Sequence, residues 1–382
     1  PNSEFSPSPQ QTPHNGQFRL QTNQAEKKIL RRKEMNIQQA IQTVVEGTDL
    51  EQDQSADAMR EIMSGEATPA QFGAFLTAMR MKGETPSEIA GMAGVMREVS
   101  LHIDTDVDMI DTCGTGGSGL NWFNISTASA FVVAGAGVPV AKHGNRAMSG
   151  STGSADVLEA LGVNITLGPE GVKTCFSKAE VGFMFAQAFH PAMKFAGPLR
   201  PQLGIRTIFN FLGPLTNPAR VKRQVIGVSD ATFAEKIAKT LEILGTEYAF
   251  VVNAESGADE IDIEGQTLLY QVNKDGLKRR RTRPADFGLQ EGLREHLVVE
   301  STEESAQIIK DIFAGAGSGH NPPIAPETSR RNVVVLNSAA ALMAAGKAVA
   351  FQEAAAMAQD SIDSGAAQAK LSSLIKISQE QS

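Results

Sequence analysis

The stretch DTCGTGGSGLNWFNIST, residues 111–127, places four glycines between a short apolar run and a helix-forming segment. Val107, Met109 and Ile110 alternate with aspartates ahead of it, as in a strand that enters a core. Residues 124–136 are small, apolar and free of proline, which is typical of a buried helix. Glycines permit a sharp turn and let backbone N–H groups approach a bulky anion at a helix start. The stretch therefore predicts a strand, a phosphate-binding turn and a helix.

The glycine pattern alone does not settle that interpretation. It matches neither GxxxxGK[ST] of the P-loop nor a clean GxGxxG of dinucleotide-binding folds. A glycine-rich turn between a strand and a helix can also be only a tight turn. The phosphate-binding interpretation therefore requires partners elsewhere in the chain.

Short apolar runs alternate with helical patterns after residue 107, which is typical of a parallel sheet covered on both faces. The expected strands are residues 110–113, 138–142, 182–185, 224–228 and 249–252. The expected helices are residues 124–136, 154–161, 169–179 and 232–244, with closing helices at 303–315, 334–345 and 350–377. Residues 268–283 are expected to form a hairpin with a basic arm at 278–283.

Residues 36–100 show only short amphipathic helices. Thr68-Pro69-Ala70-Gln71 and Thr85-Pro86-Ser87-Glu88 are capping boxes with proline at the first helical position. A helical domain this small would be marginal alone, so we expect it to pack on the main domain or on a second copy. The predicted fold class is α/β, a small helical domain plus a large α/β domain with a central, mostly parallel sheet. The predicted boundaries are a flexible tail at 1–34, the helical domain at 35–104 and the α/β domain at 105–382.

Composition narrows the class of protein. The formal net charge of −8 over 382 residues argues against a surface for nucleic acid or an anionic membrane. Cys113 and Cys175 are too few for a disulfide framework, which fits a reducing cytosol. No window is long enough to span a membrane, and residues 1–25 lack the apolar core of a signal peptide. We therefore expect a soluble, cytoplasmic protein.

A basic, hydroxyl-rich segment follows the expected strand at 138–142. It reads KHGNRAMSG at residues 142–150 and continues to Ser154. Ligands gather at the carboxyl ends of parallel strands, where such a segment would lie. Lys142 would supply a mobile point charge and Arg146 a bidentate fork for phosphate. The segment predicts the second half of an anion site.

Asp259 and Glu260 supply the opposite charge after the expected strand at 249–252. Alternation from Ile261 onward predicts a further strand, in which adjacent side chains point to opposite sides. Both carboxylates can serve one site only if the backbone is irregular there, or if they hold two ions. Magnesium (Mg²⁺) takes carboxylate oxygens together with phosphate oxygens of a ligand. Opposite two phosphate loops, the pair predicts a Mg²⁺ site.

A fourth segment, residues 190–218, carries basic side chains past the expected site. Pro191 can start a helix that runs to Gln202 and presents Lys194 and Arg200. Such side chains can simply extend to solvent. Because the other loops are expected beside it, Arg200 is predicted to bind a carboxylate through two parallel hydrogen bonds.

Together these segments resemble the anthranilate phosphoribosyltransferases, which have the nucleoside phosphorylase and phosphoribosyltransferase class III fold. The matching strings are GTGG at 114–117, NIST at 124–127, KHGNRAMSG at 142–150, GSADVLEALG at 153–162, HPAMK at 190–194, LGIRTIFNFLGPLTNP at 203–218 and Asp259-Glu260. The likeness runs from about residue 36 to about residue 376. It implies an active site in the cleft between the two domains and a homodimer formed through the helical domain. It also implies that residues 190–210 return to complete that domain.

The resemblance implies an enzyme of L-tryptophan biosynthesis. It transfers the phosphoribosyl group of 5-phosphoribosyl 1-diphosphate to the amine of anthranilate, giving N-(5-phosphoribosyl)anthranilate and diphosphate. The residues implied to line the phosphoribosyl diphosphate are Gly114, Gly117, Ser118, Trp122, Asn124, Ile125, Ser126, Thr127, Lys142, His143, Gly144, Asn145, Arg146, Ala147, Met148, Ser149, Gly150 and Ser154. Those implied for anthranilate are Gly114, Asn145, Arg200, His143 and Pro214, and those for Mg²⁺ are Ser126, Asp259 and Glu260. No residue is assigned as a general acid, general base or nucleophile.

Two positions depart from the family pattern and keep alternatives open. Ser118 stands where an Asp normally follows GTGG, and Trp122 stands where a Thr is usual. One alternative is a paralogue of this fold that uses another aromatic amine. Others are a nucleoside phosphorylase, and a non-catalytic relative that binds nucleic acid through the basic run at 278–283.

Overall fold

The computed structural model describes residues 34–147, 152–318 and 324–381. Residues 1–33 of the expected tail lie outside the described residues, as do Met148, Ser149 and Gly150 of the predicted phosphate loop. Residues 36–382 form one compact unit.

Four helices form the N-terminal part of this unit. They are α2 (Ile37–Val45), α3 (Gln52–Ser64), α4 (Pro69–Lys82) and α5 (Pro86–Glu98). The two predicted capping boxes are confirmed, because Thr68 and Thr85 cap α4 and α5 with proline at the first turn. α2 packs against α4 and α3 packs against α5. α5 also packs against α13 (Ala231–Ile243) of the α/β part, so these helices share their apolar surface with it.

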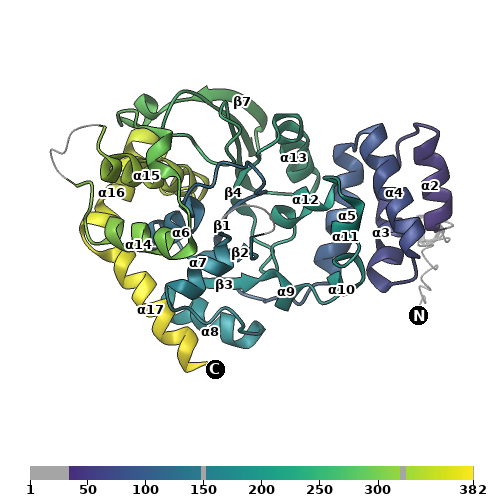
Figure 1. The fold of residues 1–382 in the computed structure, drawn as a ribbon, viewed down its shortest axis with the longest axis horizontal. Coiled ribbons are helices and arrows are strands. Elements are labelled where there is room, and N and C mark those ends of the chain that lie inside the picture. Colours follow the sequence, from purple (N-terminus) through teal and green to yellow (C-terminus); the bar gives the residue numbers. More distant parts are fainter. Residues whose placement is uncertain (1–33, 148–151, 319–323, 382) are drawn as a thin grey trace, which may run out of the picture. The chain divides into compact units, whose positions relative to one another are not determined.

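A sheet of seven strands forms the centre of the α/β part (Figure 1). Its order is β3-β2-β1-β4-β5-β6-β7, with the first five strands parallel and the last two antiparallel. The strands are β1 (Ile110–Gly114), β2 (Val140–Gly144), β3 (Val181–Phe185), β4 (Arg223–Gly227), β5 (Tyr248–Ala254), β6 (Thr267–Asn273) and β7 (Gly276–Thr282). The mostly parallel sheet and the terminal hairpin are as predicted.

Helices cover both faces of the sheet, as the alternating pattern predicts. Figure 1 shows α6 (Ile125–Gly135) and α15 (Pro326–Ala344) on one side and α13 on the other. α6 packs against β1, α15 and α17 (Ala366–Glu380), and nearly all of its side chains are buried. This matches its sequence, because a helix that is apolar all round is stable only inside a core. Further helices of this part are α7 (Ser154–Ala160), α8 (Pro169–Ala179), α9 (Ala186–Phe189), α14 (Thr302–Phe313), α16 (Phe351–Asp363) and α17 (Ala366–Glu380).

Three sequence-based expectations about local structure are wrong. Residues 261–264 form no strand and instead belong to the irregular connection from β5 to β6. The helix expected from Pro191 to Gln202 is broken into α10 (Met193–Ala196) and α11 (Arg200–Leu203), because Pro198 and Pro201 lack the N–H that a continuous helix requires. The expected helix at 350–377 is two helices, α16 and α17, separated by Gly365 in the left-handed conformation at φ 77°.

The basic arm at 278–283 lies on the edge strand β7. Arg280 stacks 4.2 Å from the ring centroid of Phe351, and Arg281 forms an ion pair with Glu255. Charged side chains on an edge strand also oppose pairing with another chain. These contacts give the arm a structural role and weaken the nucleic-acid interpretation. Within the described ranges, no helix combines the length and apolarity needed to cross a membrane.

Candidate active site

The carboxyl ends of β2, β1, β4 and β5 lie along one edge of the sheet, because these strands are parallel neighbours. Residues 114–119, termed the glycine loop, follow β1 and lead to α6. The acidic pair, Asp259 and Glu260, follows β5. Gly116 N–H donates to Asp259 Oδ2 at 2.7 Å, and Ser126 N–H at the start of α6 donates to Glu260 Oε1 at 3.2 Å. The structure therefore brings the glycine loop, the start of α6 and the acidic pair together.

Glycines make this close approach possible. A Cβ atom on Gly114 would lie 2.4 Å from Asp259 Oδ2, and one on Gly227 would lie 1.6 Å from the Asp259 carbonyl oxygen. Both contacts are far shorter than side chains tolerate, so the segment that holds Asp259 can cross the ends of β1 and β4 only over glycine. Gly144 is restricted in the same way, because its Cβ would lie 2.1 Å from Ser154 Oγ.

The acidic pair faces the site because its backbone is irregular. No strand forms from Ile261, so Asp259 and Glu260 are not held on opposite sides. Burial raises the pKa of Asp259. Burial and, next, the charge of Asp259 raise the pKa of Glu260 to about 8. Two partly buried carboxylates that repel each other favour a bound cation between or beside them.

Lys142 is held by hydrogen bonds between β1 and the start of α6. Its side chain is buried, and Nζ donates to the Thr112 carbonyl at 2.6 Å and to Ser126 Oγ at 3.4 Å. Burial lowers the pKa of Lys142, while the charges of Asp111 and Glu260 oppose that effect. The expectation of a mobile point charge is therefore wrong. The ammonium group is an immobile positive charge beside the helix start.

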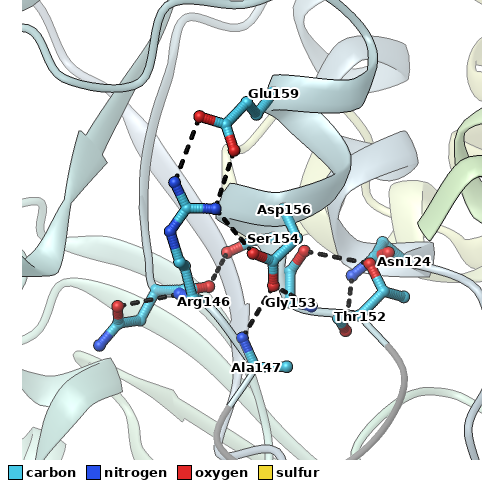
Figure 2. Close-up of polar contacts among 9 residues, drawn as sticks. Asn124, Arg146, Ala147, Thr152, Gly153, Ser154, Asp156 and Glu159 are labelled. Carbon is cyan, nitrogen blue, oxygen red and sulfur yellow. Dashed lines mark hydrogen bonds and ion pairs between the residues drawn. The ribbon is translucent and has the colours of Figure 1, made fainter. Parts of the chain in front are cut away.

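Arg146 is engaged by acidic side chains of α7, as Figure 2 shows. Its Nη1 donates to Glu159 Oε2 at 2.8 Å and to Asp156 Oδ1 at 2.9 Å, and its Nη2 donates to Glu159 Oε1 at 3.2 Å. Asp156 Oδ2 also accepts N–H bonds from Ala147 and Gly153, both at 2.9 Å. The bidentate geometry predicted for Arg146 exists, but its partner here is Glu159. Such exposed ion pairs contribute only about 0–1 kcal/mol each and can exchange for a phosphate.

Hydrogen bonds connect the start of α6 with the basic loop, whose described residues are 142–147, at the end of β2, and 152–154, at the start of α7. Asn124 Nδ2 donates to the Thr152 carbonyl at 3.4 Å (Figure 2), while Asn124 Oδ1 accepts from Ser305 Oγ at 2.8 Å. Ser154 Oγ donates to the Asn145 carbonyl at 3.4 Å. The basic loop is thereby tied to the start of α6, next to the acidic pair.

The remaining predicted donor-binding residues differ in exposure. Ile125 and Thr127 are buried in the core, which leaves mainly their backbone groups for a ligand. Trp122 is partly buried and forms an isolated antiparallel bridge with Val298. Ser118 is partly exposed within the glycine loop.

One residue predicted to contact anthranilate, His143, pairs with a second buried ring, that of His190. His143 Nε2 lies 3.2 Å from His190 Nε2, and both side chains are buried. Pro214 is buried as well. Arg200 lies with its guanidinium 5.6 Å from the ring centroid of Phe209, and burial lowers its pKa. Sequence reasoning assigned no role to His190, although it begins the HPAMK string.

Acid should destabilise the protein through this histidine pair. Burial lowers the pKa of His143 to about 3 and that of His190 to about 4. Both values lie below the ordinary 6.5, so the unfolded chain takes up protons first and stability is lost between about pH 6.5 and 4. At pH 5 the loss should be on the order of 2 kcal/mol per histidine.

Urea unfolding at pH values from about 7.5 to about 4.5 would measure this loss as a decrease in the free energy of unfolding. Asp111, Asp259 and Glu260 have raised pKa values, so these carboxyl groups increase the free energy of unfolding as the pH falls. The contribution of the histidines must therefore be measured by comparing the wild type with a histidine variant. His190→Asn should flatten the pH dependence, whereas His102→Asn, at a side chain 45% exposed, should not. Identical slopes for wild type and His190→Asn would disprove the assignment.

Known families match both parts of the chain. Residues 106–368 match the family described as "Glycosyl transferase family, a/b domain", and residues 38–100 match "Glycosyl transferase family, helical bundle domain". The chain is 52% identical over 345 residues to the anthranilate phosphoribosyltransferase of Herpetosiphon aurantiacus, which covers 90% of this chain and 99% of the relative. The chain belongs to the anthranilate phosphoribosyltransferase family. The anthranilate phosphoribosyltransferase of Roseiflexus sp. is 49% identical over 345 residues.

Solved anthranilate phosphoribosyltransferases share the fold. The enzyme from Thermus thermophilus superposes with a TM-score of 0.81 at 37% identity, covering 89% of this chain and 99% of that chain. The enzyme from Saccharomyces cerevisiae in complex with PRPP and Mg has a TM-score of 0.81 at 26% identity, covering 90% and 98%. The predicted fold class is confirmed, as is the reaction: phosphoribosyl transfer to anthranilate in tryptophan biosynthesis.

Proposed function

We propose that this anthranilate phosphoribosyltransferase binds its phosphoribosyl donor across the glycine loop, the start of α6 and the basic loop, with anthranilate beside His143 and Arg200. The observation that supports it is the pair of hydrogen bonds from Gly116 and Ser126 to Asp259 and Glu260. These bonds bring backbone N–H groups and carboxylates together at the sheet edge where α/β folds bind ligands.

Positive charge at this edge suits the diphosphate of the donor. The N-terminus of α6 carries a partial positive charge, and Lys142 places an ammonium group beside it. The N–H groups of Gly116 and Ser126 now donate to carboxylates, so an anion can replace those acceptors. These groups would stabilise the charge that develops on diphosphate as the anomeric C–O bond breaks.

The acidic pair and the Ser126 hydroxyl fit Mg²⁺. All three offer hard oxygen atoms, and the raised pKa of Glu260, about 8, reflects a carboxylate that lacks a nearby counter-charge sufficient to offset burial. Among the residues that the structure describes, no three His, Cys, Asp or Glu side chains are grouped to hold a metal by themselves. Mg²⁺ would therefore share its coordination with water and donor phosphates, and it would supply charge neutralisation there.

Arg200 and Asn145 would orient the nucleophile. Arg200 is proposed to hold the carboxylate of anthranilate, and Asn145 to align the amine with the anomeric carbon. The amine nitrogen forms the new C–N bond as the C–O bond to diphosphate breaks. An aryl amine loses its extra proton readily after attack, so no general base is assigned.

A fluorescence assay tests the proposed function. Anthranilate fluorescence should disappear when the 5-phosphoribosyl donor and Mg²⁺ are added to the enzyme, and it should persist without either. Competition with other aromatic amines would test whether Ser118 and Trp122 alter the amine accepted. Consumption of another amine in preference to anthranilate would favour the alternative of a redirected paralogue.

The domain arrangement and assembly form a second part of the proposal. We propose a helical domain at about 35–104, completed by residues near 190–210, and a homodimer formed through it in the cytoplasm. Support comes from the packing of α10 on α3. The ring of Phe195 in α10 lies so close to Gly65, the C-cap of α3, that a Cβ atom on Gly65 would be only 2.6 Å from it. Exposed Met81 of α4, 83% accessible, leaves apolar surface for a second copy. Sedimentation equilibrium would test the dimer.

A further inference from the structure

Arg206 contacts the glycine loop from a distant part of the chain. It lies between α11 and α12 (Phe209–Leu212), and its guanidinium stacks 5.2 Å from the ring centroid of Phe211. Nη1 donates to the Gly117 carbonyl at 3.3 Å, and Nη2 donates to Ser229 Oγ at 3.4 Å. A Cβ atom on Gly117 would lie 3.2 Å from the guanidinium, so the backbone approaches it closely. Arg206 has no part in the substrate and metal binding proposed for the reaction.

Ser229 extends this contact to the neighbouring peptide group. It follows β4, and its hydroxyl donates to the Gly116 carbonyl at 2.8 Å while accepting from Arg206. Its own N–H donates to Thr115 Oγ1 at 3.2 Å. Arg206 and Ser229 therefore engage two successive carbonyl oxygens of the glycine loop, those of Gly116 and Gly117.

Holding these carbonyls determines where the loop N–H groups point. In a trans peptide the C=O of one residue and the N–H of the next are antiparallel. Carbonyls of Gly116 and Gly117 that point toward Arg206 and Ser229 direct the N–H groups of Gly117 and Ser118 the opposite way. Gly116 and Gly117 have φ values of 66° and 75°, and glycine is free to leave such conformations. An external brace is therefore needed to keep the N–H groups aligned.

We propose that Arg206, acting with Ser229, is a positioning residue that holds the glycine loop with its N–H groups directed at the diphosphate of the donor. The inference rests on the proposed function, in which this loop binds that diphosphate. Arg206 touches the loop on the side of its carbonyls, so in this proposal it acts on the donor only through the loop. Its loss should weaken donor binding while the chemical step, once the donor is bound, changes little.

Steady-state kinetics and the fluorescence of Trp122 test the proposal. Trp122 is the single tryptophan of the chain and lies between the glycine loop and α6, so it reports on this region. Arg206→Ala should raise the KM for the donor about tenfold, with the anthranilate KM and kcat changed less than about twofold. Donor titration of Trp122 fluorescence should show the same loss of affinity. Arg206→Lys, which cannot form both hydrogen bonds as a planar fork, should recover only part of it.

Two further variants separate this role from a general effect on folding. Ser229→Ala removes the bond to Gly116 and should raise the donor KM in the same direction. Arg80→Ala removes a comparable stacked guanidinium, 5.9 Å from the ring centroid of Phe233, and should leave the donor KM unchanged. If Arg206→Ala does not fold, Arg206→Lys and Ser229→Ala still provide the test.

Equal increases in both KM values, or a decrease in kcat alone, would overturn the positioning role. An unchanged donor KM in folded Arg206→Ala would overturn it as well. If the wild-type enzyme turned over anthranilate but Trp122 gave no response to the donor, the brace and the proposed donor site would both be rejected. Wild-type protein without turnover would instead contradict the function on which the inference rests.

Discussion

Replacing Asp259 by Asn and Glu260 by Gln in one variant should lower Mg²⁺-dependent turnover by at least about a thousandfold, more than the loss of a single hydrogen-bond donor. Asp259 accepts a hydrogen bond from Gly116 N–H in the glycine loop, and Glu260 accepts one from Ser126 N–H at the start of α6. Amides keep the size of these side chains but remove the negative charge that binds a hard cation. Without the cation, the charge that develops on diphosphate is stabilised only by N–H groups and Lys142.

The same variant should remain folded and become more stable, which separates a catalytic defect from misfolding. Burial raises the pKa of both carboxyl groups, and the charge of Asp259 raises that of Glu260 further. A raised folded-state pKa means that the charged forms are unfavourable in the fold near neutral pH, so neutral amides should raise the Tm. Turnover measured against Mg²⁺ concentration is the decisive assay.

Glu255→Gln is the matched control for this variant. Glu255 lies on the same connection after β5, pairs with Arg281 at the surface and is exposed. Its replacement should change neither turnover nor metal dependence. Unchanged metal dependence in the double variant would remove Asp259 and Glu260 as ligands.

Local sequence signals predicted most of the secondary structure. The helix expected at 169–179 is observed as α8 (Pro169–Ala179), because Pro169 marks its first turn and its apolar spacing has the helical period. The first and last residues of the expected strands lie within about two residues of those observed for β1 to β5. The glycine loop was recognisable for the same reason, since four glycines between a strand and a helix are a local pattern.

Contacts between distant segments could not be predicted in this way. The crossing of Asp259 over Gly114 and Gly227 depends on three loops that meet only in the folded sheet. Lys142 looked mobile because nothing near it in sequence indicates that Thr112 and Ser126 hold its ammonium group. A single sequence contains no signal for such long-range pairing.

Arg146 shows an intermediate case. Its partners, Asp156 and Glu159, are only ten and thirteen residues away, within the GSADVLEALG string. They lie three residues apart on α7, and so on one face of that helix. Their spacing is readable in the sequence, but nothing in it indicates that this helix face turns toward Arg146.

The other large effect concerns Arg200. Replacing Arg200 by Ala should raise the KM for anthranilate about a hundredfold, since a charge-assisted bond to a carboxylate contributes about 1.5–3 kcal/mol. Burial lowers the pKa of Arg200, so its charge is poorly solvated and gains from an anionic partner. The donor KM should change little, because the carboxylate belongs to the other substrate.

Substrate comparison gives the sharpest test of that role. An aromatic amine without a carboxylate should be used equally poorly by the wild type and by Arg200→Ala, because the group that Arg200 recognises is absent. Arg200→Lys should retain part of the anthranilate affinity through its charge. Arg206→Ala serves as the matched control, since it should raise the donor KM and spare anthranilate. Equal increases in both KM values for Arg200→Ala, or a large effect with the carboxylate-free amine, would show that Arg200 shapes the site generally and does not bind the carboxylate.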